Sequence, residues 1–169
     1  MTLAPGPPEP VFPRLVRLYE RRGIQVMSSI TPLLWIKLAT DKTRALVEPP
    51  NDRLFTYLIA NGELCSAGGG LHMTEVHLLE CLARRLAPRR IFIIGNAYGW
   101  STLAMALAFP NASVVAIDGG QAPGGAAGIE WTNRIAREEG LKVCVVAASS
   151  PGDVAAVAHD YLGGGVRPG

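Results

Sequence analysis

Three short apolar runs in the second half of the chain are rich in β-branched residues and apolar on both faces, as strands of a buried parallel sheet must be. These runs are "IFIIG" at 91–95, "SVVAID" at 113–118 and "KVCVVAA" at 142–148. A helix-like stretch follows each run, at 101–109, 129–140 and 150–162. This alternation predicts an α/β fold, a Rossmann-like doubly wound parallel sheet with its ligand crevice at the carboxyl ends of the strands.

The first half of the chain shows helical spacing instead. In the stretch 14–22, Leu15, Leu18 and Tyr19 fall on one side, which predicts a short amphipathic helix. Three further helices are predicted at 32–46, 53–61 and 75–87. Their expected start signals are Thr31 followed by Pro32, then Asp52, then Thr74, and their expected stop signals include Gly62 and Pro88.

These patterns divide the chain into four parts. Residues 1–13 contain five prolines and predict a flexible arm. Residues 14–73 are predicted to form an N-terminal helical region, with a glycine-rich connector at 63–73. Residues 74–162 are predicted to form the Rossmann-like core, and residues 163–169 a flexible tail.

Composition narrows the class of protein further. The chain has 169 residues, of which 49% are hydrophobic, enough to bury the core of one domain. A net charge of +2 is too small to make nucleic acid an expected partner. Three widely spaced cysteines, Cys65, Cys81 and Cys144, indicate neither a disulfide framework nor a zinc site, so we expect a cytoplasmic protein without a metal. No stretch is long and apolar enough to span a bilayer.

The turn at 95–101 joins the first core strand to the next helix, so its N–H groups should point into the crevice. A dinucleotide-binding turn would need glycines at 95, 97 and 100, whereas the chain has Gly95, Ala97 and Trp100. An indole cannot replace a hydrogen where helix and strand touch. A nicotinamide or flavin dinucleotide is therefore disfavoured, and Trp100 is interpreted as core packing.

The pattern G-x-x-x-G-aromatic-S after the first strand, with an acidic residue ending the second, resembles the class I S-adenosylmethionine-dependent methyltransferases. It is most similar to the small O-methyltransferases of the catechol and caffeoyl-CoA types. The matching turn is Gly95, Asn96, Ala97, Tyr98, Gly99, Trp100 and Ser101. The resemblance runs from about Thr74 to about Val157.

This resemblance implies S-adenosylmethionine as cofactor. The backbone from Gly95 to Gly99 would lie against its methionine part, and Ser101 would bind its carboxylate. Asp118, nineteen residues beyond Gly99, would grip both ribose hydroxyls. Around the adenosine, the resemblance assigns Gly119, Ser149 and Ser150.

The chain departs from the family in three places. Ile93 stands where members usually carry an acidic residue near the ammonium of the cofactor. The glycine-rich stretch 119–128 predicts a long mobile flap beside the adenosine site. Finally, the sequence ends where a fourth strand would begin, so the C-terminal half expected from the resemblance is missing and the chain looks truncated.

Two functions follow from these observations. The first is methyl transfer to a small-molecule acceptor, for which His72 is the candidate base. His77 and His159 are interpreted as ordinary surface residues. The second is a non-catalytic adenosyl-ligand-binding or interaction module that has lost the acceptor site.

The strand order of the family would leave the first core strand at an edge of the sheet. An apolar edge strand templates association, so something should cover it. We expect a homodimer, or a strand supplied by residues 24–29 or 45–49.

Overall fold

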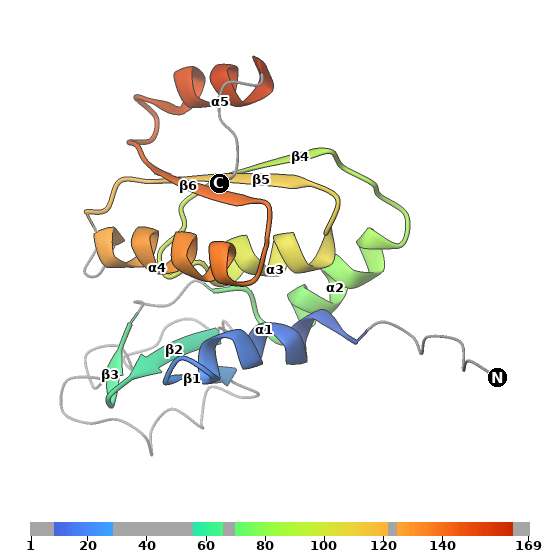
Figure 1. The fold of residues 1–169 in the computed structure, drawn as a ribbon, viewed down its shortest axis with the longest axis vertical. Helices are drawn as coiled ribbons and strands as arrows, with labels where there is room; N and C mark the ends of the chain where they lie inside the picture. Colours follow the sequence, from blue (N-terminus) through green and yellow to red (C-terminus); the bar gives the residue numbers. More distant parts are fainter. Residues whose placement is uncertain (1–8, 29–55, 66–69, 122–124, 164–169) are drawn as a thin grey trace, which may run out of the picture.

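The computed structural model describes residues 9–28, 56–65, 70–121 and 125–163 (Figure 1). Its central feature is a parallel sheet of three strands, β4 (Arg90–Ile94), β5 (Ser113–Asp118) and β6 (Val143–Ala147), in the order β4-β5-β6. All three strands were predicted from the sequence. Residues 114–117 of β5 are all buried, which explains why this run is apolar on both faces.

Helices cover both faces of this sheet, as the doubly wound pattern requires. Helices α3 (Trp100–Ala108) and α4 (Gly125–Glu138) lie on one face, and α5 (Val154–Gly163) lies on the other (Figure 1). The fold is therefore α/β and Rossmann-like, as predicted. Because every connection between the strands passes through a helix, the carboxyl ends of β4, β5 and β6 meet at the same edge.

Two N-terminal helices pack beneath α3. Helix α1 (Val11–Glu20) buries one face, made of Val11, Leu15, Leu18 and Tyr19, so the predicted amphipathic helix is confirmed. It begins earlier than predicted, however, and the predicted arm at 1–13 is too long. Pro13 is accommodated in the first turn, where a proline costs no intrahelical hydrogen bond.

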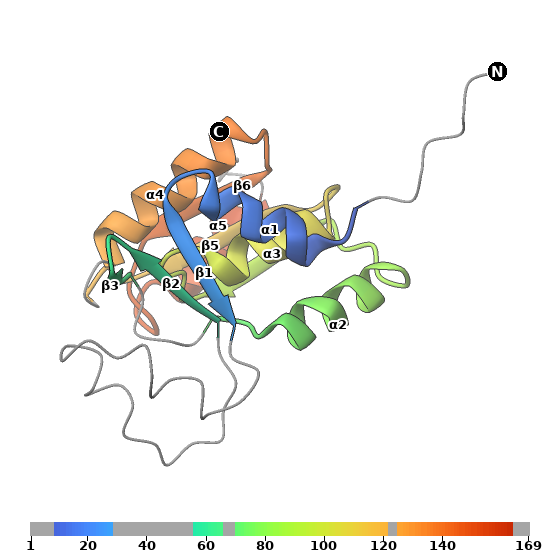
Figure 2. The same ribbon diagram turned by 90° about the horizontal axis from the view of Figure 1, so that it is seen from below.

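The predicted helix at 53–61 is wrong. Residues Thr56–Ala60 form strand β2, which pairs antiparallel with β1 (Ile24–Ser28) and β3 (Glu63–Leu64) in a second small sheet (Figure 2). Asn61 and Gly62 have φ values of +52° and +78°, the geometry of a two-residue hairpin turn rather than a helix end. The N-terminal region is thus mixed α and β, and the helix predicted at 32–46 lies outside the described residues.

Three other boundaries also differ from the prediction. Helix α2 (Met73–Ala83) begins before Thr74 and ends well before Pro88. Helix α5 begins at Val154 rather than at Ser150, because a turn over 150–153 comes first. In that turn, Asp153 accepts a hydrogen bond from the backbone of Ser149 at 2.8 Å.

Strand β4 lies at an edge of its sheet, as expected. Residues 24–28 do not cover this edge, because they pair with β2, and residues 45–49 lie outside the described residues. Within the described ranges, no helix has the length and apolar character needed to cross a membrane. Cys65, Cys81 and Cys144 are free thiols in the structure.

Candidate functional site

The turn between β4 and α3 has an unusual backbone. Gly95, Ala97 and Gly99 have φ values of +88°, +47° and +81°, so alternate residues adopt the left-handed conformation. Glycine accepts this conformation without penalty, whereas alanine does not. A strained alanine persists only where its surroundings hold it, and such positions concentrate at functional sites.

Asp118 supplies that support from the end of β5. Its Oδ2 accepts hydrogen bonds from the backbone N–H groups of Asn96 and Ala97, both at 2.8 Å, and its Oδ1 accepts one from Gly120 at 2.8 Å. Partial burial raises the pKa of this carboxyl, but the three N–H donors outweigh burial and lower the pKa below its ordinary value. Asp118 is therefore a carboxylate at neutral pH.

The side chain of Asn96 fixes the turn from the protein side. Its amide nitrogen donates to Ala97 O at 2.9 Å and to Thr132 Oγ1 at 3.0 Å, while its Oδ1 accepts from Thr102 Oγ1 at 2.9 Å. Asn96, Thr102 and Thr132 are all buried. The amide thereby ties the turn to α3 and α4, so the side chain of Asn96 serves the turn rather than a ligand.

Helix α4 approaches the turn so closely that only glycine fits. A Cβ on Gly128 would lie 2.0 Å from Ala97 O, and a Cβ on Gly99 would lie 2.2 Å from Thr132 Oγ1. Helix α4 starts at Gly125, so the flap predicted over 119–128 is wrong for residues 125–128. Gly125 and Gly128 serve close packing in a helix, and residues 122–124 lie outside the described ranges.

Trp100 anchors the N-terminal elements to the core. It is 3% exposed, its ring contacts Tyr19 and Phe12 of α1, and its Nε1 donates to Leu71 O at 2.8 Å. The interpretation of Trp100 as core packing is confirmed. One edge of its indole also reaches the crevice described next.

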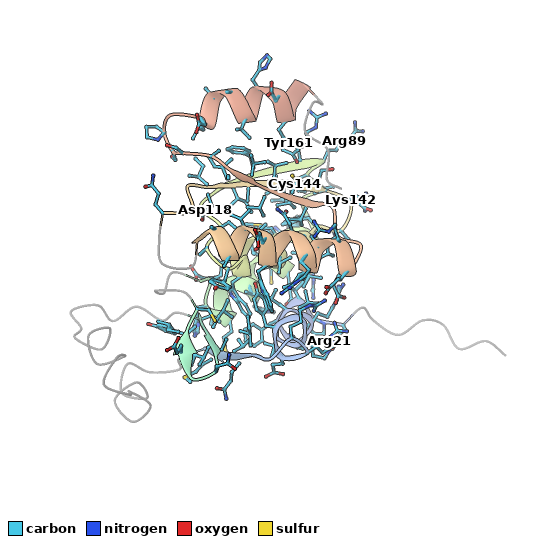
Figure 3. All side chains as sticks on the ribbon, turned by 60° about the vertical axis from the view of Figure 1, so that its left-hand side comes forward. Arg21, Arg89, Asp118, Lys142, Cys144 and Tyr161 are labelled. Atoms are coloured by element: carbon cyan, nitrogen blue, oxygen red, sulfur yellow. The ribbon has the colours of Figure 1, made fainter. Side chains whose placement is uncertain are left out.

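Two adjoining hollows form a crevice over the carboxyl ends of the strands. The first, about 440 Å³, lies between the turn, α3 and the small sheet, and the second, about 300 Å³, lies over the ends of β5 and β6. They share Ile94, Gly95 and Asp118. Figure 3 shows Asp118 at the end of the sheet opposite to Arg89 and Lys142.

Most of the cofactor-binding residues predicted from the sequence line this crevice. The first hollow is lined by Gly95, Asn96, Ala97, Tyr98, Ser101 and Asp118. The second is lined by Gly95 and Asp118 again, with Gly119, Ser149 and Ser150. Gly99 lines neither hollow, because it packs against Thr132.

Sequence reasoning missed several lining residues. Leu58 and Gly70 reach the first hollow from the N-terminal half, and Gln121 reaches the second. Leu58 lies on β2, which was predicted as a helix, so its position beside the turn could not be predicted from the sequence. The parallel strand pattern alone would have placed Ile93 and Ile94 at the crevice edge.

His72, the candidate base, caps α2. It is 5% exposed, and its Nδ1 accepts from Thr74 N at 3.3 Å while its backbone N–H donates to Glu75 at 2.7 Å. Together these bonds form a capping box, so the predicted cap at Thr74 is wrong. His72 lines neither hollow, and its catalytic role stays a prediction.

We expect His72→Ala to lower the free energy of unfolding by about 1 kcal/mol, since a capping side chain is lost. His72→Asn should retain most of the stability, because asparagine is a good cap. Thermal or urea unfolding of both variants measures this difference. Equal losses in both variants would contradict the capping role.

A larger hollow, about 500 Å³, follows the outer face of α4 and shares only Tyr98 with the crevice. It contains Arg134, whose guanidinium lies 4.7 Å from the ring centroid of Trp131. No strand end opens into it. The crevice remains the candidate site, although it is not the larger hollow, because the N-terminus of α3 and a carboxylate held by three backbone N–H groups lie there. Among the described residues, no cluster of acidic, histidine or cysteine side chains could hold a metal ion.

Comparison with known proteins gives little at the level of sequence: no family model and no curated protein matches the chain. Among solved structures, it is similar to coclaurine N-methyltransferase bound to N-methylheliamine and SAH (S-adenosylhomocysteine), at 16% identity and a TM-score of 0.39. The match covers 82% of this chain and 37% of that enzyme. The chain therefore spans less than half the length of that structure.

Proposed function

We propose that this chain binds S-adenosylmethionine in the crevice and belongs to the class I methyltransferases, transferring the methyl group to a small-molecule acceptor. One observation carries the proposal. A carboxylate at the end of β5 is bound to the strained turn after β4, at the point where adjoining hollows meet. That arrangement suits a nucleoside ribose, because a carboxylate accepts from hydroxyl groups.

The residues present fit such a ligand. Asp118 Oδ1 accepts only one hydrogen bond from the described residues, which leaves a lone pair for a ribose hydroxyl. The face of Gly95 where a Cβ would stand is open, with no atom within 4 Å, so a ligand can lie against the backbone. Ser101, in the first turn of α3, would bind a carboxylate with help from the helix N-terminus.

S-adenosylmethionine held by the turn and Asp118 would supply an electrophilic methyl group for transfer to an acceptor lone pair, and the electron pair of the carbon–sulfur bond would stay on sulfur. For such a displacement, the chain mainly has to hold donor and acceptor in line. Among the described residues lining the crevice, Asp118 is the one carboxylate and no histidine is present. An acceptor that needs no base therefore fits best.

The second candidate is a binding module without turnover. This candidate is favoured because the described crevice lining includes no histidine that could act as a base. It is also favoured because Ile93 stands where the resemblance implies an acidic contact to the cofactor. A radiolabelled methyl-transfer assay on a panel of amines, phenols and thiols distinguishes the two. Label in any acceptor supports the enzyme, whereas ligand binding without transfer supports the module.

Isothermal calorimetry tests the proposal at the level of the ligand. We expect S-adenosylhomocysteine and S-adenosylmethionine to bind with one site per chain, and NAD to give no heat, because Trp100 occupies the position of the third dinucleotide glycine. NAD binding with no response to either adenosyl ligand would overturn the proposal.

We also expect two copies of the chain to associate. The edge of β4 is unpaired among the described residues. Leu78 and Leu82 of α2 are 57% and 39% exposed, and Leu86, which follows this helix, is 53% exposed. Burying both surfaces would remove an aggregation-prone edge and an apolar patch. Light scattering should give the mass of a dimer, and Leu78→Lys with Leu82→Lys should shift it toward the monomer. A monomer with rapidly exchanging amides at 91–94 would refute this expectation.

A further inference from the structure

The two edges of the parallel sheet differ in how their backbone groups are used. On the outer side of β6, the side-chain amide of Asn133 donates to Val145 O at 2.9 Å and accepts from Val145 N at 2.8 Å, while Val143 N donates to Leu141 O at 2.9 Å. These contacts occupy groups that another strand would need. On the outer side of β4, no strand of the described ranges pairs with the backbone, so this edge is open.

The alternation of the backbone determines which residues of β4 face the open edge. Ser113 N donates to Arg89 O at 3.0 Å and Gly95 N donates to Ile117 O at 2.8 Å, so the odd-numbered residues of this stretch face β5. Successive residues of a strand direct their N–H and C=O groups to opposite sides. The backbone groups of the even-numbered residues, Phe92 among them, therefore point to the open edge.

Exposed apolar side chains gather on the same side of the molecule. Among the described residues, the exposed large hydrophobic side chains all belong to α2, to the segment that follows it or to β4, and they are Met73, Leu78, Leu82, Leu86 and Ile94. Helix α4 packs under β6, and α2 lies beside α3 on the side away from α4 (Figure 2), which is the side of β4. This concentration indicates that the open edge and α2 form one interaction surface.

The charges at the two ends of β4 suit a second copy that runs antiparallel. Arg90 begins the strand, and its guanidinium lies 5.8 Å from the ring centroid of Tyr161. At the other end, Ile94 lines both hollows of the crevice, where Asp118 is the one charged residue of the described lining. Antiparallel pairing brings the basic start of each strand toward the Asp118 end of the other copy, whereas parallel pairing would align the two arginines.

We propose that two copies of this chain pair antiparallel through the open edges of β4, so that their two three-stranded sheets form one continuous sheet. Because even-numbered residues offer their backbone at this edge, the register with the greatest overlap pairs Phe92 with the partner's Phe92 and Arg90 with the partner's Ile94. The partner's Arg90 then lies at the mouth of each crevice, whose described lining has no basic residue. The inference rests on the association expected under the proposed function and does not depend on the identity of the ligand.

Residue-resolved amide hydrogen exchange of the native chain tests this pairing, at a concentration where light scattering gives the mass of a dimer. We expect the amides of Phe92 and Ile94 to exchange within about tenfold of the rate of Ile93, whose amide faces β5. A dimer in which Phe92 and Ile94 exchange more than about tenfold faster than Ile93 would overturn the proposal, because the copies would then meet on another surface. A monomer would overturn it as well.

A proline at position 92 provides a second test with a matched control. Proline lacks the N–H group that the pairing needs, and this group points away from β5, so Phe92→Pro should keep the ladder between β4 and β5. Phe92→Val removes the same ring from beside Tyr161 but keeps the N–H group. By sedimentation of the folded variants, we expect the dimer dissociation constant of Phe92→Pro to be at least about tenfold above that of Phe92→Val. Equal dissociation constants would overturn the proposal.

The outcomes separate this inference from the proposed function. If the amides of Phe92 and Ile94 are unprotected while S-adenosylhomocysteine binds, the strand pairing is wrong and the proposed ligand is retained. If these amides are protected while no adenosyl ligand binds, the proposed function is wrong and the strand pairing is retained.

Discussion

Asp118→Ala is expected to weaken the binding of S-adenosylhomocysteine by about a hundredfold. A hydrogen bond to a charged acceptor contributes about 1.5–3 kcal/mol, and the ribose contact would be lost outright. The same change also releases Asn96 N, Ala97 N and Gly120 N, which Asp118 holds at 2.8 Å. The turn would then have to be ordered by the ligand itself, so the two effects act in the same direction.

Calorimetry of the folded variant measures this loss, and Asp160→Asn provides a control. Asp160 lies on α5 with a side chain that is 66% exposed, far from the turn in sequence, so its neutralisation should leave binding unchanged. Unchanged affinity in a folded Asp118→Ala variant would place the ribose elsewhere. Equal weakening in both variants would indicate a general effect of charge rather than a contact.

Gly128→Ala should produce the largest loss of stability. Its Cβ would lie 2.0 Å from Ala97 O and 2.8 Å from Ala97 C, a clash of backbone against backbone that no side-chain rotation relieves. Overpacking of this kind costs about 3 kcal/mol. Alanine is intrinsically the better helix former by about 1 kcal/mol, so a net loss of about 2 kcal/mol is expected in the free energy of unfolding.

The matched control is Gly152→Ala, where the new methyl group meets Ser149 Oγ at 3.7 Å, an ordinary contact. Urea denaturation of both variants should show a large loss at 128 and a small change at 152. Because the clash pushes on Ala97, Gly128→Ala should also weaken ligand binding beyond its effect on folding. A Gly128→Ala protein as stable as the native chain would contradict the observed approach of α4 to the turn.

The parallel core was readable from the sequence because its signals are local. Each strand is a continuous apolar run, each is followed by a helix, and the turn at 95–101 follows directly from that order. The small N-terminal sheet was not readable. Strand β1 pairs with β2 across more than 25 residues, and "NG" at 61–62 fits both a helix end and a hairpin turn.

In the candidate site too, the residues with local sequence signals were predicted, and those that depend on tertiary packing were not. Gly95, Ser101 and Asp118 could be placed because strand ends of a parallel sheet share one edge. The flap prediction failed because glycines at 125 and 128 have two uses, and close packing against Ala97 is visible only in three dimensions. The role of His72 was hidden for a similar reason, since histidine is a rare helix cap and its burial depends on packing of the N-terminal elements.

We propose that an adenosyl ligand lies between the turn after β4 and the end of β5. The most direct test is a titration of ¹⁵N-labelled protein with S-adenosylhomocysteine, followed by amide chemical shifts. The largest shifts are expected at the amides of Gly95, Ala97, Ser101 and Gly119, while the indole resonance of Trp131, beside the hollow along α4, stays in place. Shifts confined to Trp131 and its neighbours on α4, with the amides of the turn unmoved, would contradict this placement of the ligand.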